Sequence, residues 1–228
     1  MKRVLVIDIG GSHVKLMISP SERRKFPSGP AMTPRQFAAS VRANVEGWEF
    51  EAVAIGFPAP VRAGRILAEP KNLGRRWRRY EFRKALGKPV RIVNDAAMQA
   101  LGSYRGGRML FLGLGTGVGS ALVWRNHVLS LELSDLPYVH RNTLEARFGD
   151  AGLRKLGKRR WATELAGVLT RLRMAMIADY AVLGGGNAKL IGPLPEGFEL
   201  GHNRNAYLGG KRLWETRAGT RQPKWAFL

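Results

Sequence analysis

Two glycine turns, each flanked by apolar runs, constrain this chain more than any other feature. The first lies within Val4–Ile18 and contains Gly10-Gly11, and the second lies within Met109–Val123 and reads Gly115-Thr116-Gly117. Glycine adopts positive φ without a Cβ clash and lets backbone N–H groups approach an anion closely. Because one turn stands near the start of each half of the chain, the sequence predicts a phosphate chain held between two lobes.

The residues after each turn distinguish this pattern from the other phosphate-binding loops. The segments His13–Ile18 and Ser120–Trp124 are rich in β-branched and apolar residues and predict returning strands. A dinucleotide fingerprint requires a helix after its glycines, and no Gly-x-x-x-x-Gly-Lys-Ser/Thr run is present. Strand, glycine turn and strand, with Asp8 at the start, resembles the phosphate hairpin of the actin-like, hexokinase-type ATPases.

The rest of the chain alternates between predicted strands and helices. A Thr33-Pro34 N-cap predicts a helix with Phe37, Val41 and Val45 on its core face. The other predicted elements are strands at 52–57, 90–93 and 181–183 and helices at 81–86, 96–104 and 161–176, with 19–32 as a loop. We expect an α/β fold with an N-terminal lobe at 1–105, a C-terminal lobe at 106–215 and a tail or partner-contacting arm at 216–228.

Composition sets the class of protein. Of 228 residues, 45% are apolar, which predicts a globular chain with a real core. There is no Cys, which excludes disulfides and thiolate chemistry and agrees with a reducing cytoplasm. Since no apolar stretch approaches the roughly 18 residues needed to cross a bilayer, we expect no membrane partner and a cytoplasmic location.

The charge is unusual for such a chain. Lys+Arg 38 minus Asp+Glu 17 gives a net charge of +21. Basic clusters occur at Arg75–Arg79, which includes the aromatic Trp77, at Arg154–Arg160 and at Lys211-Arg212. Such a surface attracts polyanions. A basic cluster with an aromatic residue is one form of nucleic-acid site, but no recognisable binding motif surrounds it, so the sequence disfavours nucleic-acid readout.

Six short motifs occur in the order found in the ROK-family sugar kinases, and the pattern resembles the polyphosphate glucokinase branch. Together they cover the chain through about Trp214. They are Ile7–Ser12, Ile55–Pro58, Pro70–Leu73, Val93–Ala96, Leu114–Gly119 and Leu183–Gly186. The resemblance implies a two-lobed actin-like ATPase fold of ribonuclease-H-like topology. It also implies a hexose acceptor, with glucose expected, a donor that is polyphosphate or ATP, and Mg²⁺ as cofactor.

Asp95 is the candidate catalytic base. A carboxylate within hydrogen-bond reach of a sugar hydroxyl accepts its proton as the bond to phosphorus forms. The alternative is that Asp95 caps the helix at 96–104, and cap geometry suits Asn94 and Asp95 equally. The family pattern favours catalysis.

Asp8 is the second candidate carboxylate. At the mouth of a phosphate hairpin it repels phosphate unless a cation intervenes, which argues for Mg²⁺ held directly or through water. The alternative is an Asp that satisfies turn N–H groups. The remaining donor-binding candidates share small size or a hydroxyl group: Gly10, Gly11, Ser12, Gly115, Thr116, Gly117, Gly185 and Gly186.

The sugar contacts come from the resemblance. They are Asn72, Asn94, Glu132 and Glu145. The family continues after the first glutamate to a His, but this chain has Asp135 there, and an ionised Asp can only accept hydrogen bonds. With no Cys and scattered His residues, we expect no zinc.

Three hypotheses follow. The first is a sugar kinase that uses polyphosphate, ATP or both, and it allows a homodimer. The second, suggested by Asp135, is a non-catalytic sugar- or nucleotide-binding relative. The third is a basic nucleic-acid-binding protein on the same fold. Asp8 and Asp95 favour the first.

Overall fold

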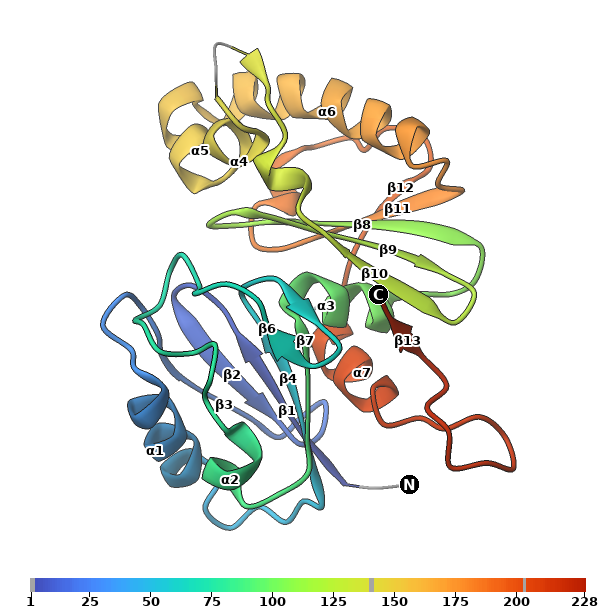
Figure 1. Cartoon of the computed structure of the whole chain (residues 1–228). Helices are drawn as coiled ribbons and strands as arrows, with labels where there is room; N and C mark the ends of the chain where they lie inside the picture. The colour runs from blue at the N-terminus through green and yellow to red at the C-terminus, as the bar shows by residue number, and fades with distance from the viewer. Residues whose placement is uncertain (1–2, 140–141, 203) are drawn as a thin grey trace.

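The computed structural model describes residues 3–139, 142–202 and 204–228. Two sheets, each with helices on its outer face, stack with two helices between them (Figure 1). No helix in the described ranges is long and apolar enough to cross a membrane.

The N-terminal sheet has the order β3-β2-β1-β4-β7. β1, β2 and β3 are antiparallel neighbours, whereas β4 and β7 add in parallel. The strands are β1 (Val4–Ile9), β2 (His13–Met17), β3 (Arg23–Pro27), β4 (Ala52–Phe57) and β7 (Val90–Asn94), and a separate small hairpin joins β5 (Val61–Arg62) to β6 (Arg65–Ile66). β3 lies within 19–32, for which the sequence predicts a loop. Its pairing with β2 stabilises it where its own pattern, with Phe26 alone buried, does not.

The C-terminal sheet repeats this topology. Its order is β12-β11-β8-β9-β10-β13, so β10-β9-β8-β11-β12 corresponds strand for strand to the first sheet. The strands are β8 (Arg108–Leu114), β9 (Val118–Trp124), β10 (His127–Leu131), β11 (Tyr180–Gly184), β12 (Phe198–Leu200) and β13 (Ala226–Phe227). The segment 216–228, expected as a tail, instead supplies β13, and Trp225 is buried in the core.

The helices divide between the outer faces and the space between the sheets (Figure 1). α1 (Pro34–Asn44) and α2 (Phe82–Leu86) cover the N-terminal sheet, and Phe37, Val41 and Phe82 pack there. The outer face of the C-terminal sheet carries α4 (Leu144–Phe148), α5 (Asp150–Leu156) and α6 (Lys158–Ala175). Two short 3-10 helices, η1 (Leu133–Asp135) and η3 (Ala188–Leu190), lie in the connections of this half of the chain. α1 begins at the predicted Thr33 cap, where Thr33 and Gln36 form a capping box.

α3 (Asp95–Ser103) and α7 (Asn205–Arg212) fill the space between the sheets. Their backbones touch: a Cβ added to Gly102 would overlap the carbonyl oxygen of Asn205, and one added to Gly209 would overlap that of Met98. Such contact needs glycine on both helices. It fixes the position of α3, and therefore of Asp95 at its first turn.

α7 belongs in sequence to 106–215 but packs against the N-terminal sheet. A Cβ on Gly210 would overlap the side chain of Val6 in β1, and the Tyr207 hydroxyl donates to the Ile18 carbonyl at 3.1 Å. The chain therefore returns to the N-terminal sheet after building most of the C-terminal one.

Candidate active site

Asn94 and Asp95 stand at the junction of β7 and α3, and the structure separates their roles. Asn94 is the N-cap of α3: its Oδ1 accepts from the Ala97 N–H at 3.1 Å, and its Nδ2 donates to the Ala59 carbonyl at 3.3 Å. Asp95 is the first helical residue, and its Oδ1 accepts from the Ala96 N–H at 2.8 Å. Because Asn94 caps the helix, Asp95 is not needed as the cap.

The surroundings of Asp95 favour the neutral form of its carboxyl group up to about pH 7. Burial is the main cause and raises the pKa of Asp95 to about 7, with further increases from the negative charges of Asp8 and Glu132. The Ala96 N–H opposes this rise. A carboxyl group with a pKa near neutrality is suited to accept a proton at physiological pH.

Asp8 is the second-to-last residue of β1, beside the first glycine turn. Its side chain is buried, and burial raises its pKa while the Lys15 ammonium, 3.6 Å from Asp8 Oδ2, opposes that increase. Lys15 is mostly exposed, so this pair only partly compensates a buried negative charge. Asp8 and Asp95 therefore form a locally anionic pair.

Both glycine turns have the predicted hairpin form, and they meet. The Gly10 N–H donates to the His13 carbonyl and the Gly115 N–H to the Gly117 carbonyl, each at 3.0 Å. A Cβ added to Gly11 would lie 3.5 Å from both Thr116 Oγ1 and the Asn72 Cβ. The structure thus brings together the first hairpin, the second hairpin and the loop that carries Asn72.

The third glycine segment lies beside the second hairpin. Gly185 has φ 82°, and a Cβ there would overlap the backbone of Leu114. Next to Gly186, the Asn187 N–H donates to the Leu114 carbonyl at 3.0 Å, and its side chain donates to Asp150 Oδ1 at 2.6 Å. Sequence reasoning missed Asp150, at the start of α5, because only folding brings it to this turn.

The candidate sugar contacts lie near ion pairs between the two lobes, which the sequence did not predict. Lys71 Nζ lies 3.0 Å from Asp135 Oδ1 and 3.3 Å from Glu145 Oε1. Lys71 precedes Asn72, whereas Asp135 and Glu145 belong to η1 and α4 of the C-terminal lobe. The only signal in the sequence was a lysine inside the Pro70–Leu73 motif.

Glu132 and Glu145 occupy different positions at this end of the site. Glu132 precedes η1 and is exposed at the surface, but desolvation by its neighbours, followed by the charge of Asp135, raises its pKa. A Cβ added to Gly117 would lie 2.5 Å from Glu145 Oε2, which places Glu145 directly against the second hairpin. Among the sugar candidates, Asn94 is already engaged through both ends of its amide.

Comparisons with known proteins agree with this architecture. No protein-family model matches the chain. A glucokinase from Pyrobaculum calidifontis is 27% identical over 125 residues, which is 52% of this chain and 42% of that protein. The chain therefore spans less than half the length of this curated relative.

Solved structures match along nearly the whole chain. The inorganic polyphosphate/ATP-glucomannokinase from Arthrobacter sp. strain KM has a TM-score of 0.79 and 21% identity, with 92% of this chain and 97% of that one covered. A ROK-family glucokinase from Streptomyces griseus, solved with glucose and AMPPNP, has a TM-score of 0.74 and 16% identity, with 91% and 97% covered. The chain has the actin-like ATPase fold of the ROK-family sugar kinases, as its motifs predict.

Proposed function

We propose that this chain is a sugar kinase that transfers a phosphoryl group from polyphosphate or ATP to a hexose hydroxyl, with glucose to glucose 6-phosphate as the reaction. The observation that carries the proposal is Asp95: its neighbour Asn94 caps α3, and Asp95 itself is a partly buried carboxyl group with a pKa of about 7. The meeting of both glycine hairpins supports a phosphate site in the same junction.

In this mechanism Asp95 is the general base. The sugar oxygen forms a bond to the terminal phosphorus as the bond from phosphorus to the bridging oxygen breaks. The hydroxyl proton passes to Asp95, and the shortened donor leaves with the electron pair of the bridging oxygen. The Gly10 and Gly115 N–H groups close the two hairpins, and in this mechanism the N–H groups of Gly11, Thr116 and Gly117 face the donor. Together with the Ser12 and Thr116 hydroxyls, these three N–H groups bind the donor oxygens. The Gly185-Gly186 turn provides a place for the rest of an ATP donor.

The site also suits Mg²⁺. Asp8 is buried and Asp95 partly buried, and the negative charge of Asp8 raises the pKa of Asp95, so an added cation would stabilise both carboxylates. In the described ranges there is no group of three or more metal-ligating side chains. Asp8 would hold such an ion, directly or through water, and water and donor phosphate oxygens would supply its other ligands. When bound, it neutralises charge on the donor.

Asn72, Glu132 and Glu145 are the proposed sugar contacts. The Lys71–Asp135 pair holds the loop that carries Asn72 against the C-terminal lobe. A coupled assay of glucose 6-phosphate formation, with ATP and long-chain polyphosphate in parallel, tests the reaction. No product from either donor would contradict the proposal.

The activity is expected to depend on the ionisation of Asp95. Since the base works deprotonated, log kcat/KM should rise with unit slope below pH 7 and level off above it. The measurement is a pH profile at constant ionic strength. A flat profile between about pH 5.5 and 8, given the pKa of about 7, would exclude Asp95 as the base.

The identity of the donor is expected to determine how strongly the donor KM depends on salt concentration. Each neutralised phosphate of a long polyanion releases condensed counterions, so polyphosphate binding weakens steeply as salt rises. The polyphosphate KM should therefore increase faster with salt than the ATP KM, and it should fall as the chain lengthens. Equal salt slopes, or turnover with ATP alone, would exclude polyphosphate as the donor.

The Lys71–Asp135 pair is expected to affect acceptor binding modestly. Both side chains are more than half exposed, and an exposed pair contributes about 0.2–1 kcal/mol. Lys71→Met and Asp135→Asn should each raise the glucose KM about two- to fivefold at low salt. The glucose KM of the double variant should be no higher than that of the more impaired single variant. Arg3→Met, which breaks a pair with Glu49 of the same lobe, is the control.

A further inference from the structure

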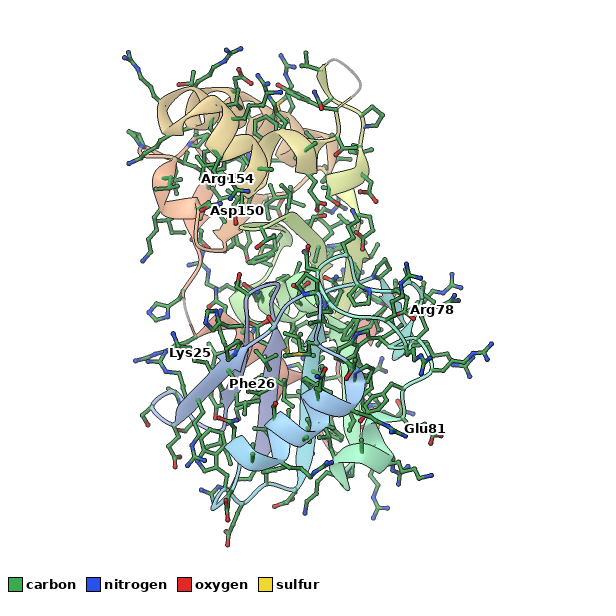
Figure 2. All side chains as sticks on the ribbon, turned by 90° about the vertical axis from the view of Figure 1, so that its left-hand side faces the viewer. Lys25, Phe26, Arg78, Glu81, Asp150 and Arg154 are labelled. Atoms are coloured by element: carbon green, nitrogen blue, oxygen red, sulfur yellow. The ribbon has the colours of Figure 1, made fainter. Side chains whose placement is uncertain are left out.

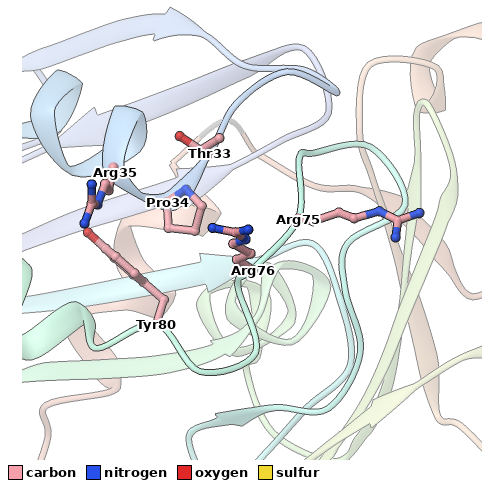
Figure 3. Close-up of a pocket in the computed structure, with 6 residues that line it drawn as sticks. All are labelled: Thr33, Pro34, Arg35, Arg75, Arg76 and Tyr80. Carbon is pink, nitrogen blue, oxygen red and sulfur yellow. The ribbon is translucent and has the colours of Figure 1, made fainter.

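An arginine-lined cavity lies at the start of α1, apart from the carboxyl groups of the active site. It has a volume of about 470 Å³ and is lined by Thr33, Pro34, Arg35, Arg75, Arg76 and Tyr80. In Figure 3 the Arg35 and Arg76 guanidinium groups lie on either side of Pro34, with the Tyr80 hydroxyl beside Arg35. Arg75 extends in the opposite direction from the same loop.

The cavity has positive charge without compensation. No carboxyl group lines it, and within the described ranges none of Arg35, Arg75 and Arg76 has an acidic group within ion-pair distance. Four arginines of the described ranges do have a carboxylate partner, for example Arg147 with Glu164 at 2.6 Å. Guanidinium groups gathered without a carboxylate repel one another, and an anion between them removes that repulsion.

The backbone holds Arg76 in place at a cost. Its φ is 76°, in the left-handed region that non-glycine residues seldom occupy. Such a conformation is strained, and it persists where the surroundings impose it. Here it turns the Arg76 side chain toward α1 while Arg75 points away.

The basic lining continues into a second cavity. This cavity, of about 870 Å³, shares Arg76 and Tyr80 with the first and adds three more arginines, Arg65, Arg78 and Arg79. Two carboxylates also line this cavity. Glu69 accepts the backbone N–H groups of Trp77 at 3.0 Å and Arg78 at 3.4 Å, whereas Glu81 is exposed, so four arginines face two acidic side chains here. We call the six arginines that line the two cavities the arginine tract: Arg35, Arg65, Arg75, Arg76, Arg78 and Arg79.

The arginine tract starts next to the first phosphate hairpin. Ser28 ties the hairpin to the segment before α1, since its Oγ donates to the Gly10 carbonyl at 2.6 Å and its N–H to the Ser12 carbonyl at 3.0 Å. The Gly74 N–H donates to the Met32 carbonyl at 3.1 Å in that same segment. Arg75 follows Gly74 directly. A chain of phosphates that leaves the hairpin on this side meets the tract.

The aromatic residue within the cluster does not support a nucleic-acid partner. Binding of single strands combines backbone contacts with bases stacked on exposed aromatic rings. Trp77 is fully buried and packs against Phe37 and Phe57 in the core of the N-terminal lobe. The aromatic ring that both cavities share is that of Tyr80, which is partly exposed, and the six arginines outnumber it. This lining favours an inorganic polyanion over a strand of stacked bases.

We propose that the arginine tract binds the distal part of a condensed-phosphate chain whose terminal group lies between the two glycine hairpins. The proposal rests on the proposed polyphosphate donor. The Arg154–Arg160 cluster lies on the other lobe, and Figure 2 shows Arg78 and Arg154 far apart on the face it presents. The two clusters therefore do not form one continuous track, and the tract beside the hairpin is the one that extends the donor site.

The test is direct binding of labelled long-chain polyphosphate, without sugar, across a salt series. The double variant Arg35→Gln/Arg76→Gln should reduce the slope of log affinity against log salt by about 1.4, or about 0.7 for each lost contact. Tripolyphosphate binding and the ATP KM should change less than about twofold, since a short donor stays between the hairpins.

The matched control is Arg154→Gln/Arg159→Gln, which removes the same charge from the other cluster. Equal losses in the two double variants would overturn the proposal, because they would show a general charge effect. Tighter binding of a poly(dT) strand than of polyphosphate, lost in Arg35→Gln/Arg76→Gln, would overturn it in favour of a nucleic-acid site. An unchanged melting temperature verifies that each variant is folded, and Arg35→Lys/Arg76→Lys, which keeps the charge, should restore most of the salt slope.

This experiment separates the tract from the reaction. If wild-type protein binds long-chain polyphosphate through the tract but phosphorylates no sugar, the proposed function fails and the binding site stands. If sugar is phosphorylated from polyphosphate while the double variant binds it as wild type does, the reaction stands and the tract fails.

Discussion

Asp95→Asn is expected to lower kcat at least about a hundredfold, because the variant keeps the shape of the side chain but cannot take a proton from the sugar hydroxyl. The amide oxygen still accepts the Ala96 N–H, and Asn94 still caps α3, so the fold of the site is preserved. The measurement is steady-state turnover with saturating glucose and either donor. Near-wild-type kcat in a folded variant would remove Asp95 from the mechanism.

The same substitution separates catalysis from stability. The pKa of Asp95 is raised to about 7 in the folded chain, so between about pH 4 and 7 the folded state binds a proton that the unfolded state releases. The free energy of unfolding therefore decreases as pH rises through this range. Asp95→Asn removes this partly buried charge, and the melting temperature of the variant at pH 8 should exceed that of the wild type. A lower melting temperature would indicate that Asp95 has a structural role.

Gly209→Val is expected to destabilise the fold by about 3 kcal/mol or more. Its side chain would overlap the Met98 carbonyl of α3, and the neighbour that must move is backbone, which cannot rotate away. The measurement is the urea midpoint of unfolding. Gly167→Ala is the control: it also lies inside a helix, α6, but a Cβ there meets no atom within 4 Å, so it should stabilise by up to about 1 kcal/mol. Equal effects at the two positions would contradict the backbone contact.

Local patterns predicted the elements whose stability is local. The Thr33-Pro34 cap, the strand 52–57 and the two glycine hairpins follow from side-chain periodicity and turn chemistry, and they stand where the sequence placed them. β3 and β13 were missed since each depends on pairing with a strand that already exists, and neither has an alternating apolar pattern. The position of α7 on the N-terminal sheet was missed for a similar reason, because glycine contacts leave no periodic signal of their partner.

In the site, too, local sequence predicted some features and contacts between distant residues determined others. Sequence left the choice of N-cap between Asn94 and Asp95 open, and one hydrogen bond, from the Ala97 N–H to Asn94, decides it. The pairing of Lys71 with Asp135 joins residues from different lobes, and no spacing within the chain encodes that distance. Asp135 is thus explained by its partner in space, where the family pattern alone showed only a missing His.

The return of α7 to the N-terminal sheet has a consequence for how this protein unfolds. The core around α3 and α7 takes side chains from both sheets, including Val6 and Ala54 from one and Phe111 and Val182 from the other. Removing either sheet would expose this shared core. The two halves, despite their matching strand orders, therefore depend on each other for folding, and thermal or chemical denaturation should proceed as a single cooperative transition.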